Sequence, residues 1–431
     1  DAITIGGNLS GSGALTIQPK TASTTIGIGS AASGTLSLDD TELGRLVDGF
    51  SSITLGSTTG TGAIAVAYTT PYTFTDPLTI RSNTSGGGAI SATSALNTGT
   101  NSLTITSGGA VSVAAITSGT LAITGTGITL NGDVTTSGTQ TYTGAVTLGA
   151  DVTLASTGNA STGNTVSFSS TINGAKAFTV NAGVGAITFN STIGATTNLT
   201  SLSLTTTHAT GITLSGNITT TGSQTYNGAT TLAATPITLT TTNSDVSFGG
   251  TLNGNAASRA LTIAAGIGSV TFTGAVGGGT PLGAVAITAA TTTNSSTWVG
   301  SSTLGITGNA VINGALSGIT TLTVSGTTSL GANVTTTAVG GQTYSGAVTI
   351  TGSAVTLDSS SNNGVVLFSS TVNSAANGDN SASATKPLTV SAGSGNVTFT
   401  GPVGVATNGA LGALTVNSSG TVSYTHLRAH E

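Results

Sequence analysis

The chain has 431 residues, of which only 4% are charged, and its formal net charge at pH 7 is -5. With seven Lys and Arg scattered along it, a nucleic-acid-binding surface has almost no electrostatic basis. Cysteine is absent, which excludes a disulfide framework and thiolate metal sites and fits a large exported protein.

The sequence contains neither a signal peptide nor an apolar run of transmembrane length, so we expect no membrane insertion within these residues. It begins at Asp1 rather than Met, and we interpret it as an internal piece of a longer protein. Hydrophobic residues make up 37% and fall in short β-branched runs between turn residues. This pattern predicts a packed β structure rather than disorder.

Residues 1–127 consist largely of apolar–polar–apolar triplets, each followed by Gly or another turn residue. Ala14-Leu-Thr-Ile17 and Thr25-Ile-Gly-Ile28 are early examples. Alternation with a period of two sends the apolar pair to one face of a strand and the middle residue to the other. We therefore predict irregular coils of very short, half-buried strands in this region.

One segment departs from the triplet pattern. Residues 39–49 begin with Asp39 and Asp40, place Leu43 and Leu46 at helical spacing, and end at Gly49. They predict a helix of one or two turns that caps or flanks the coils.

A longer unit then occurs three times. Each copy contains a Gln-Thr-Tyr triplet, whose tyrosines are Tyr142, Tyr226 and Tyr344. Two similar triplets that end in Phe follow it, which in copy 1 are Val166-Ser-Phe168 and Ile187-Thr-Phe189. We divide the chain into irregular coils at 1–127, copy 1 at 128–211, copy 2 at 212–290, inserted coils at 291–327, copy 3 at 328–422 and a tail at 423–431. The tail breaks the pattern, and we interpret it as non-native.

The parallel β-solenoid is favoured over the alternative all-β architecture, a string of tandem Ig-like β-sandwiches. Tyr142 and Tyr226 are 84 residues apart, which is about four coils of roughly 20 residues, or one sandwich domain. The triplets are shorter than sandwich strands, and aromatic residues make up only 4%. We expect about 20 coils, with strand edges at both ends that promote end-to-end self-association.

Several features together resemble the repeat regions of large bacterial exoproteins: the Gln-Thr-Tyr-x-Gly-Ala units, the Thr-, Ser- and Gly-rich triplets, and Leu38–Leu46 before Ile53-Thr-Leu55-Gly. The filamentous-haemagglutinin-like adhesins and the autotransporter passengers are the most similar group, over residues 1–422. This resemblance implies a right-handed parallel β-helix, export across the outer membrane, and an adhesive or stalk role at the bacterial cell surface. The partners would be glycans or proteins of host or neighbouring cells.

Side chains suited to catalysis are scarce. Asp39 and Asp40 are the only adjacent carboxylates, and capping of the short helix is favoured over catalysis for them. His208 is interpreted as a loop residue. Five further aspartates are interpreted as turn residues: Asp133, Asp151, Asp245, Asp358 and Asp379. We predict no catalytic, cofactor-binding or metal site, and therefore no enzyme.

Four aromatic residues are candidates for contact with a partner. Tyr142, Tyr226 and Tyr344 could act as platforms for glycans, although packing at a coil corner against the Gln of the same triplet is favoured. Trp298, in the inserted coils, becomes the first candidate if its ring is exposed.

Two other functions stay open. A glycan-processing β-helix enzyme would need carboxylates clustered on one face of the coils. Outward Thr columns could instead organise water and bind ice, but the mixture of Thr with Ser and Asn and the varied coil lengths favour simple hydration.

Overall fold

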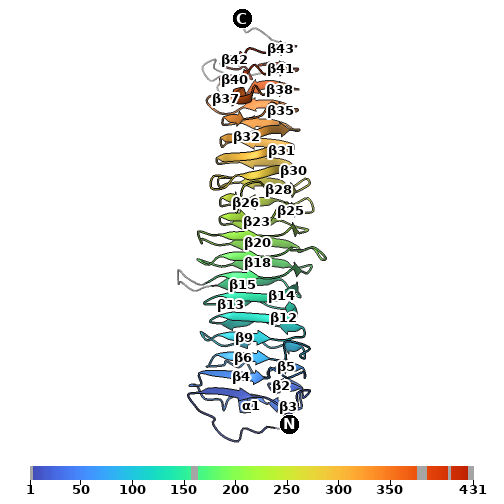
Figure 1. The fold of residues 1–431 in the computed structure, drawn as a ribbon, viewed down its shortest axis with the longest axis vertical. Coiled ribbons are helices and arrows are strands. Elements are labelled where there is room, and N and C mark those ends of the chain that lie inside the picture. Colours follow the sequence, from blue (N-terminus) through green and yellow to red (C-terminus); the bar gives the residue numbers. More distant parts are fainter. Residues whose placement is uncertain (1–2, 157–163, 376–385, 406–408, 426–431) are drawn as a thin grey trace. The chain divides into compact units, whose positions relative to one another are not determined.

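The computed structural model describes residues 3–156, 164–375, 386–405 and 409–425. It is nearly all β, and the chain divides into two compact units, Asp1–Thr219 and Thr220–Glu431. Within each unit, short strands stack in parallel from one coil to the next (Figure 1). The prediction of a parallel β-solenoid is confirmed, and tandem sandwiches are excluded because the strand ladders of the described residues are parallel.

The strands of the first unit form three parallel columns, which we call faces A, B and C. Face A contains β1 (Ala14–Ile17), β4 (Ser52–Gly56), β6 (Leu78–Arg81), β9 (Leu103–Thr106), the first halves of β12 (Leu121–Leu130) and β14 (Gln140–Leu148), β16 (Val166–Phe168), β19 (Ile187–Phe189) and β21 (Ile212–Leu214). Face B contains β3 (Leu36–Leu38), β2 (Ile26–Ile28), β5 (Ile64–Val66), β7 (Ile90–Ala92), β10 (Val111–Val113), the second halves of β12 and β14, β17 (Ile172–Asn173) and β22 (Ile218–Thr219). Face C contains β8 (Leu96–Asn97), β11 (Ile116–Ser118), β13 (Val134–Thr136), β15 (Val152–Ser156), β18 (Ala177–Asn181) and β20 (Ser201–Thr205).

The second unit has the same three-column plan, in faces D, E and F. Face D contains β23 (Gln224–Asn227), β26 (Val246–Phe248), β29 (Ser269–Phe272), the ends of β30 (Leu282–Asn294) and β31 (Trp298–Ile312), β33 (Thr328–Leu330), β36 (Val348–Ile350) and β39 (Val372–Ser374). Face E contains β24 (Thr230–Leu232), β27 (Leu252–Gly254), the starts of β31 and β32 (Leu316–Val324), β34 (Val334–Thr336), β37 (Val355–Asp358), β40 (Leu388–Gly393) and β42 (Leu414–Ser418). Face F contains β25 (Ile237–Thr240), β28 (Arg259–Ala264), inner parts of β30, β31 and β32, β35 (Gln342–Tyr344), β38 (Val366–Phe368), β41 (Val397–Phe399) and β43 (Val422–Tyr424).

Coil length varies, although the strand columns stay in register. Leu103 pairs with Leu121 across a short coil, whereas Ile53 pairs with Leu78 across a longer one. The extra residues leave the columns at the corners between faces. The chain makes about 16 turns, fewer than we expected, because many coils are longer than the length assumed from the repeats.

The triplets place their side chains as predicted. In strands such as Val166–Phe168 and Ile212–Leu214 the two outer residues are buried and the middle one is half-buried. The expected helical segment contains α1 (Asp40–Leu43), which is followed by the buried residue Leu46. The segment before β1 lies against this helix, since Ile5 N donates to Glu42 at 2.9 Å and Leu9 bridges to Leu46.

Part of the predicted tail belongs to the fold. Val422–Tyr424 forms β43 and pairs in register with Val397–Phe399, and the ring of Tyr424 stacks on Phe399 with centroids 5.0 Å apart. Residues 426–431 lie outside the described part of the chain.

Each repeat copy builds a stack of three aromatic rings inside the coils. The Tyr of the Gln-Thr-Tyr triplet lies against the Phe that follows one coil later, and that Phe lies against another in the next coil. The stacks are Tyr142–Phe168–Phe189, Tyr226–Phe248–Phe272 and Tyr344–Phe368–Phe399, with neighbouring centroids 4.7–5.3 Å apart. A repeat is thus a module of three rungs that share one aromatic column.

In the second unit the two modules use different faces. Gln224 lies in face D and Gln342 lies in face F. The distance between the copies along the chain is therefore not a whole number of turns, and matching surfaces of the two copies point in different directions.

The middle ring of a stack should contribute strongly to stability. Phe248 is 1% exposed and lies between Tyr226 and Phe272. We expect Phe248→Ala to lower the free energy of unfolding by about 3–5 kcal/mol, measured by denaturant titration, because it leaves a cavity in the coil. The control Thr271→Ala, at an outward position in the next coil, should change it by less than about 0.5 kcal/mol. Equal losses in the two variants would contradict a supporting role for the stack.

Candidate functional site

The Gln-Thr-Tyr triplets lie inside the coils, with only the Thr directed outwards. The Tyr142 hydroxyl donates to Gln140 Oε1 at 2.9 Å, and Gln140 Nε2 donates to Thr136 Oγ1 at 3.1 Å and to the Ala155 carbonyl at 2.9 Å. The same Tyr-to-Gln bond recurs at 2.8 Å in the other two copies. Each pair thus satisfies its polar atoms within the core, as buried groups must.

This burial corrects the idea that these tyrosines contact a partner. Tyr142, Tyr226 and Tyr344 are 0% exposed, so no glycan can stack on their rings while the coils are intact. Their contact with Gln exists, but along a strand rather than at a corner. Alternation itself decides this, because residues two apart on a strand share a face.

Trp298 is also buried, so the condition that would make it the first candidate for a partner contact is not met. It is 1% exposed, and its ring nitrogen donates to Ser301 Oγ at 3.0 Å. Its ring meets Phe272 edge-on, with centroids 5.1 Å apart. Trp298 pairs with Val276 at the start of β31, an inward position that the sequence around it did not reveal.

The N-terminal segment gathers many of the charged residues, and each described contact there is structural. The Asp39 carboxylate accepts from the Glu42 backbone N–H at 2.7 Å, and Glu42 accepts from Asp39 N at 3.0 Å and Ile5 N at 2.9 Å. This is the capping box of α1, which supports the capping interpretation of Asp39.

Asp40 has a different role from that of its neighbour. Its carboxylate accepts from the hydroxyl and N–H of Thr69 and from the N–H groups of Ser30 and Thr70. These bonds, the Thr69 hydroxyl first, lower the pKa of Asp40 to about 2. The two adjacent carboxylates therefore hold different pieces of backbone and do not form an acid–base pair.

Sequence reasoning missed Asp76, a buried carboxylate just before β6. It is 3% exposed, and its Oδ1 accepts from Gly49 N at 3.0 Å. Its Oδ2 has no hydrogen-bond partner in the described part of the chain. The one feature of the sequence that points to Asp76 is the Pro that follows it, in Asp-Pro-Leu. The same motif is common in ordinary turns, so it does not predict a buried carboxylate.

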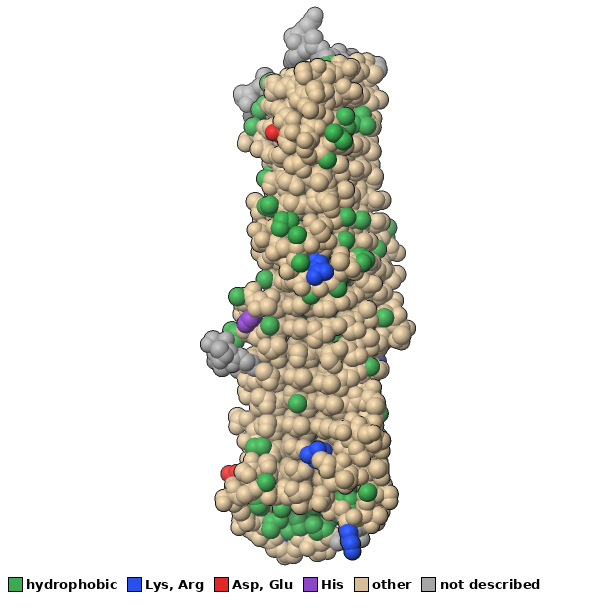
Figure 2. All heavy atoms as spheres, viewed as in Figure 1, with side chains coloured by type: hydrophobic (Ala, Val, Ile, Leu, Met, Phe, Trp, Pro, Cys, Tyr) green, Lys and Arg blue, Asp and Glu red, His purple; other side chains and the backbone are tan. Residues whose placement is uncertain are grey.

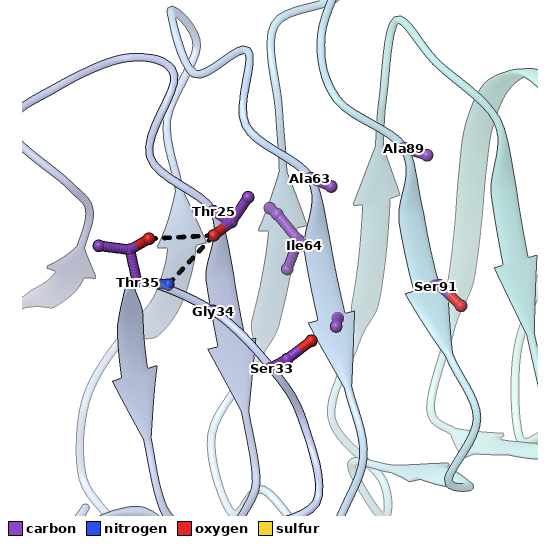
Figure 3. A pocket seen from close by; sticks show the side chains of 9 residues that line it. Thr25, Ser33, Gly34, Thr35, Ala63, Ile64, Ala89 and Ser91 are labelled. Carbon is purple, nitrogen blue, oxygen red and sulfur yellow. Dashed lines mark hydrogen bonds between the residues drawn. The ribbon is translucent and has the colours of Figure 1, made fainter.

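The described surface has a shallow groove on face B of the first unit (Figure 3). Its volume is about 390 Å³. Ala63, Ala65, Ala89 and Ser91 of the β5 and β7 region line it, together with the loop that carries Ser33 and Gly34. None of its lining residues is ionisable, so the groove offers no acid, base or metal ligand.

A close backbone crossing forms one wall of the groove. The loop between β2 and β3 passes over β2, where a Cβ on Gly34 would lie 2.1 Å from the backbone nitrogen of Gly27. Thr35 N donates to Thr25 Oγ1 at 3.0 Å and fixes the return of the loop (Figure 3). Glycine at position 34 is thus required by space.

The turn aspartates accept backbone N–H groups, mostly from the following coil. Asp133 accepts from Thr153 at 2.8 Å, Asp151 from Ala177 at 2.9 Å and Asp245 from Ser269 at 2.8 Å. Asp358 accepts from Ser360, close to it in the chain, and Asp379 lies outside the described residues. These contacts fit the interpretation of the described aspartates as turn residues.

His208 also has a local contact, since its Nδ1 accepts from Thr210 N at 3.0 Å within its own loop. Among the described residues, no group of three or more His, Cys, Asp or Glu side chains could hold a metal ion. No helix in the described ranges is long and apolar enough to cross a bilayer.

Comparison with known proteins gives no match. No protein-family model matches the chain, and no curated protein or solved structure matches it.

The buried tyrosines should make stability depend on pH in the alkaline range. Burial raises the pKa of Tyr142, Tyr226 and Tyr344 well above its ordinary value of 10.0. The unfolded chain releases these protons near pH 10, whereas the folded chain retains them. Their contribution to stability is therefore complete below about pH 10 and is lost as the pH rises beyond it.

Denaturant midpoints measured from about pH 9 to pH 12 should fall with pH, while tyrosinate absorbance of the folded chain stays below that of the unfolded chain. In Tyr226→Phe the denaturant midpoint should fall less steeply with pH, because the substitution removes one of the titrating groups. Coincident titration of the folded and unfolded chains would contradict the burial.

Proposed function

We propose that this chain is a non-enzymatic structural and adhesive segment of a secreted or cell-surface bacterial exoprotein. The proposal rests on one observation: polar side chains of the described residues make their hydrogen bonds to other groups of the fold. The Gln–Tyr pairs satisfy each other inside the coils, and the turn carboxylates hold backbone N–H groups. What each unit offers outwards is a surface made largely of uncharged polar side chains and backbone (Figure 2).

The surface chemistry supports a spacer or contact surface rather than a reaction centre. Figure 2 shows few charged side chains on the visible face of either unit. Where carboxylates do occur near one another, as at Asp39 and Asp40, they bind separate backbone groups. A surface of hydroxyls and amides contacts glycans or proteins through many weak, shared hydrogen bonds.

The interior supports a mechanical role within each unit. Hydrogen bonds between coils run along the stack, so many bonds resist separation of neighbouring coils. Aromatic pairs such as Tyr142–Phe168, with centroids 4.7 Å apart, add contacts in the same direction. A surface stalk needs this resistance, whereas an enzyme needs a concave site with convergent polar groups.

The resemblance to filamentous-haemagglutinin-like adhesins and autotransporter passengers supports the same assignment. Extracellular or cell-surface location, export across the outer membrane, and glycan or protein partners on other cells are all parts of this proposal. A glycan-processing enzyme is its rival. The lining of the groove on face B has no carboxylate for such an enzyme to use.

Incubation with a panel of acidic and neutral polysaccharides tests the non-enzymatic assignment. We expect no new reducing ends and no loss of polymer length after prolonged incubation. Binding without cleavage, measured by retention on immobilised glycans, would support adhesion. Reproducible cleavage that disappears in a variant with the groove blocked, such as Ala65→Trp, would overturn the proposal in favour of the rival.

Self-association also belongs to the proposal, and the coil formed by β42 and β43 is its most suitable site. Leu414, Val416 and Val422 occupy triplet positions that are buried elsewhere, yet each is only half-buried. Strand edges of this kind pair readily with another strand.

Sedimentation velocity over a range of concentrations should show association that weakens in Val416→Lys. The matched control Thr415→Lys, at a neighbouring exposed position, should associate like the parent chain. A strictly monomeric parent chain, or equal effects of the two substitutions, would contradict self-association through this coil.

A further inference from the structure

Face A of the first unit carries a ladder of threonines at the outward position of successive coils. Seven of its nine rungs have Thr at this position, and the other two have Ala or Ser. In order the rungs are Thr16, Thr54, Thr79, Thr104, Ala122, Thr141, Ser167, Thr188 and Thr213. Each is the direct register partner of the next.

This register corrects the argument that varied coil lengths disturb the outward Thr columns. Thr79 and Thr104 are separated by a longer stretch of chain than Ala122 and Thr141, yet all four lie in one ladder. The length differences are absorbed at the corners, outside the strands. The hydroxyls on this face are therefore spaced by the sheet, about 4.8 Å from rung to rung.

A second column runs beside the first over the middle of the face. Thr106, Thr124 and Thr143 are register partners on consecutive coils, two residues beyond the first column. Residues two apart on a strand are separated by about 6.5 Å. The two columns together make a two-dimensional array of hydroxyl and methyl groups.

The hydroxyls of this array are available to water or a ligand. Within the described part of the chain, no side-chain hydrogen bond occupies the hydroxyls of Thr104, Thr106, Thr124, Thr141 and Thr143. Corner threonines differ, since Thr98 Oγ1 donates to the Asn101 carbonyl and Thr136 Oγ1 to the Gly138 carbonyl, both at 2.7 Å. Because Thr is β-branched, its χ1 angle is already restricted, and little side-chain freedom remains to be lost on binding.

The chemistry of the array restricts its partner. It contains no aromatic side chain on which a sugar ring could stack, and Arg81 is the one charged residue aligned with its second column. A polyanion or a stacked polysaccharide is therefore poorly matched. A neutral, periodic lattice of hydrogen-bond donors and acceptors with a flat surface fits the array.

We propose that face A of the first unit binds ice, through an array of five threonines between Thr104 and Thr143 in which Ala122 takes the sixth position. The other two faces serve as internal comparison. The outward column of face C passes through Asn97, Thr117, Thr135 and Ala155. That of face B passes through Ala65, Ser91, Ser112 and Thr129. Neither has Thr at five of six outward positions over three consecutive coils, as face A does from Thr104 to Thr143, where Ala122 takes the sixth position.

Thermal hysteresis and retention in a slowly growing ice hemisphere test the proposal on the full chain. We expect measurable hysteresis, and several-fold loss of both signals in a Thr141→Lys, Thr143→Lys double variant, because the ammonium groups disrupt the array. Thr135→Lys on face C, at an equally exposed strand position, should retain both signals. Circular dichroism and denaturant midpoints confirm that the variants keep the fold.

Absence of hysteresis and of ice retention in the parent chain would overturn the proposal and leave the ladder as a hydrated surface. Equal losses in the face A and face C variants would overturn the assignment to face A. Binding to microcrystalline cellulose without hysteresis would replace ice by a polysaccharide surface. None of these results decides whether the chain is an enzyme, which the polysaccharide cleavage test decides separately.

Discussion

Parallel stacking of one coil on the next is the constraint on which the rest of this structure depends. The backbone N–H and C=O groups of each strand bond to the coils on either side, so register is shared along a whole face. Once register is fixed, the two outer residues of every triplet point inwards and the middle residue points outwards. The same constraint thus produces both the apolar interior and the outward columns of hydroxyls.

Polar groups inside the stack are tolerated because they occur in complementary sets. Gln224 and Tyr226 are fully buried, and each satisfies the other while the Gln amide also reaches a carbonyl of the following coil. An unpaired amide or phenol at this depth would cost about 1–3 kcal/mol. The repeated Gln-Thr-Tyr unit therefore marks the rung at which an aromatic stack begins, and its recurrence within the chain has a structural cause.

The proposed functions follow from what this architecture leaves at the surface. The carboxylates of Asp39 and Asp151 accept backbone N–H groups of α1 and of a following coil. The faces that remain carry few charges and keep a regular strand register, which suits contact with extended surfaces. Within the second unit, the shift of Gln224 and Gln342 to different faces means that matching patches of the two copies lie on different sides of the stack.

The amino-acid sequence alone determined the strands, the direction of their side chains and the parallel solenoid class. Alternation in triplets such as Val166–Phe168 is local, and the capping signals around Asp39 and Glu42 are local as well. Only the tertiary structure decided which residues stack on which, because coil length varies and register is a property of neighbouring coils. That is why the burial of Trp298, the aromatic columns and the Thr ladder of face A could not be derived from spacing along the chain.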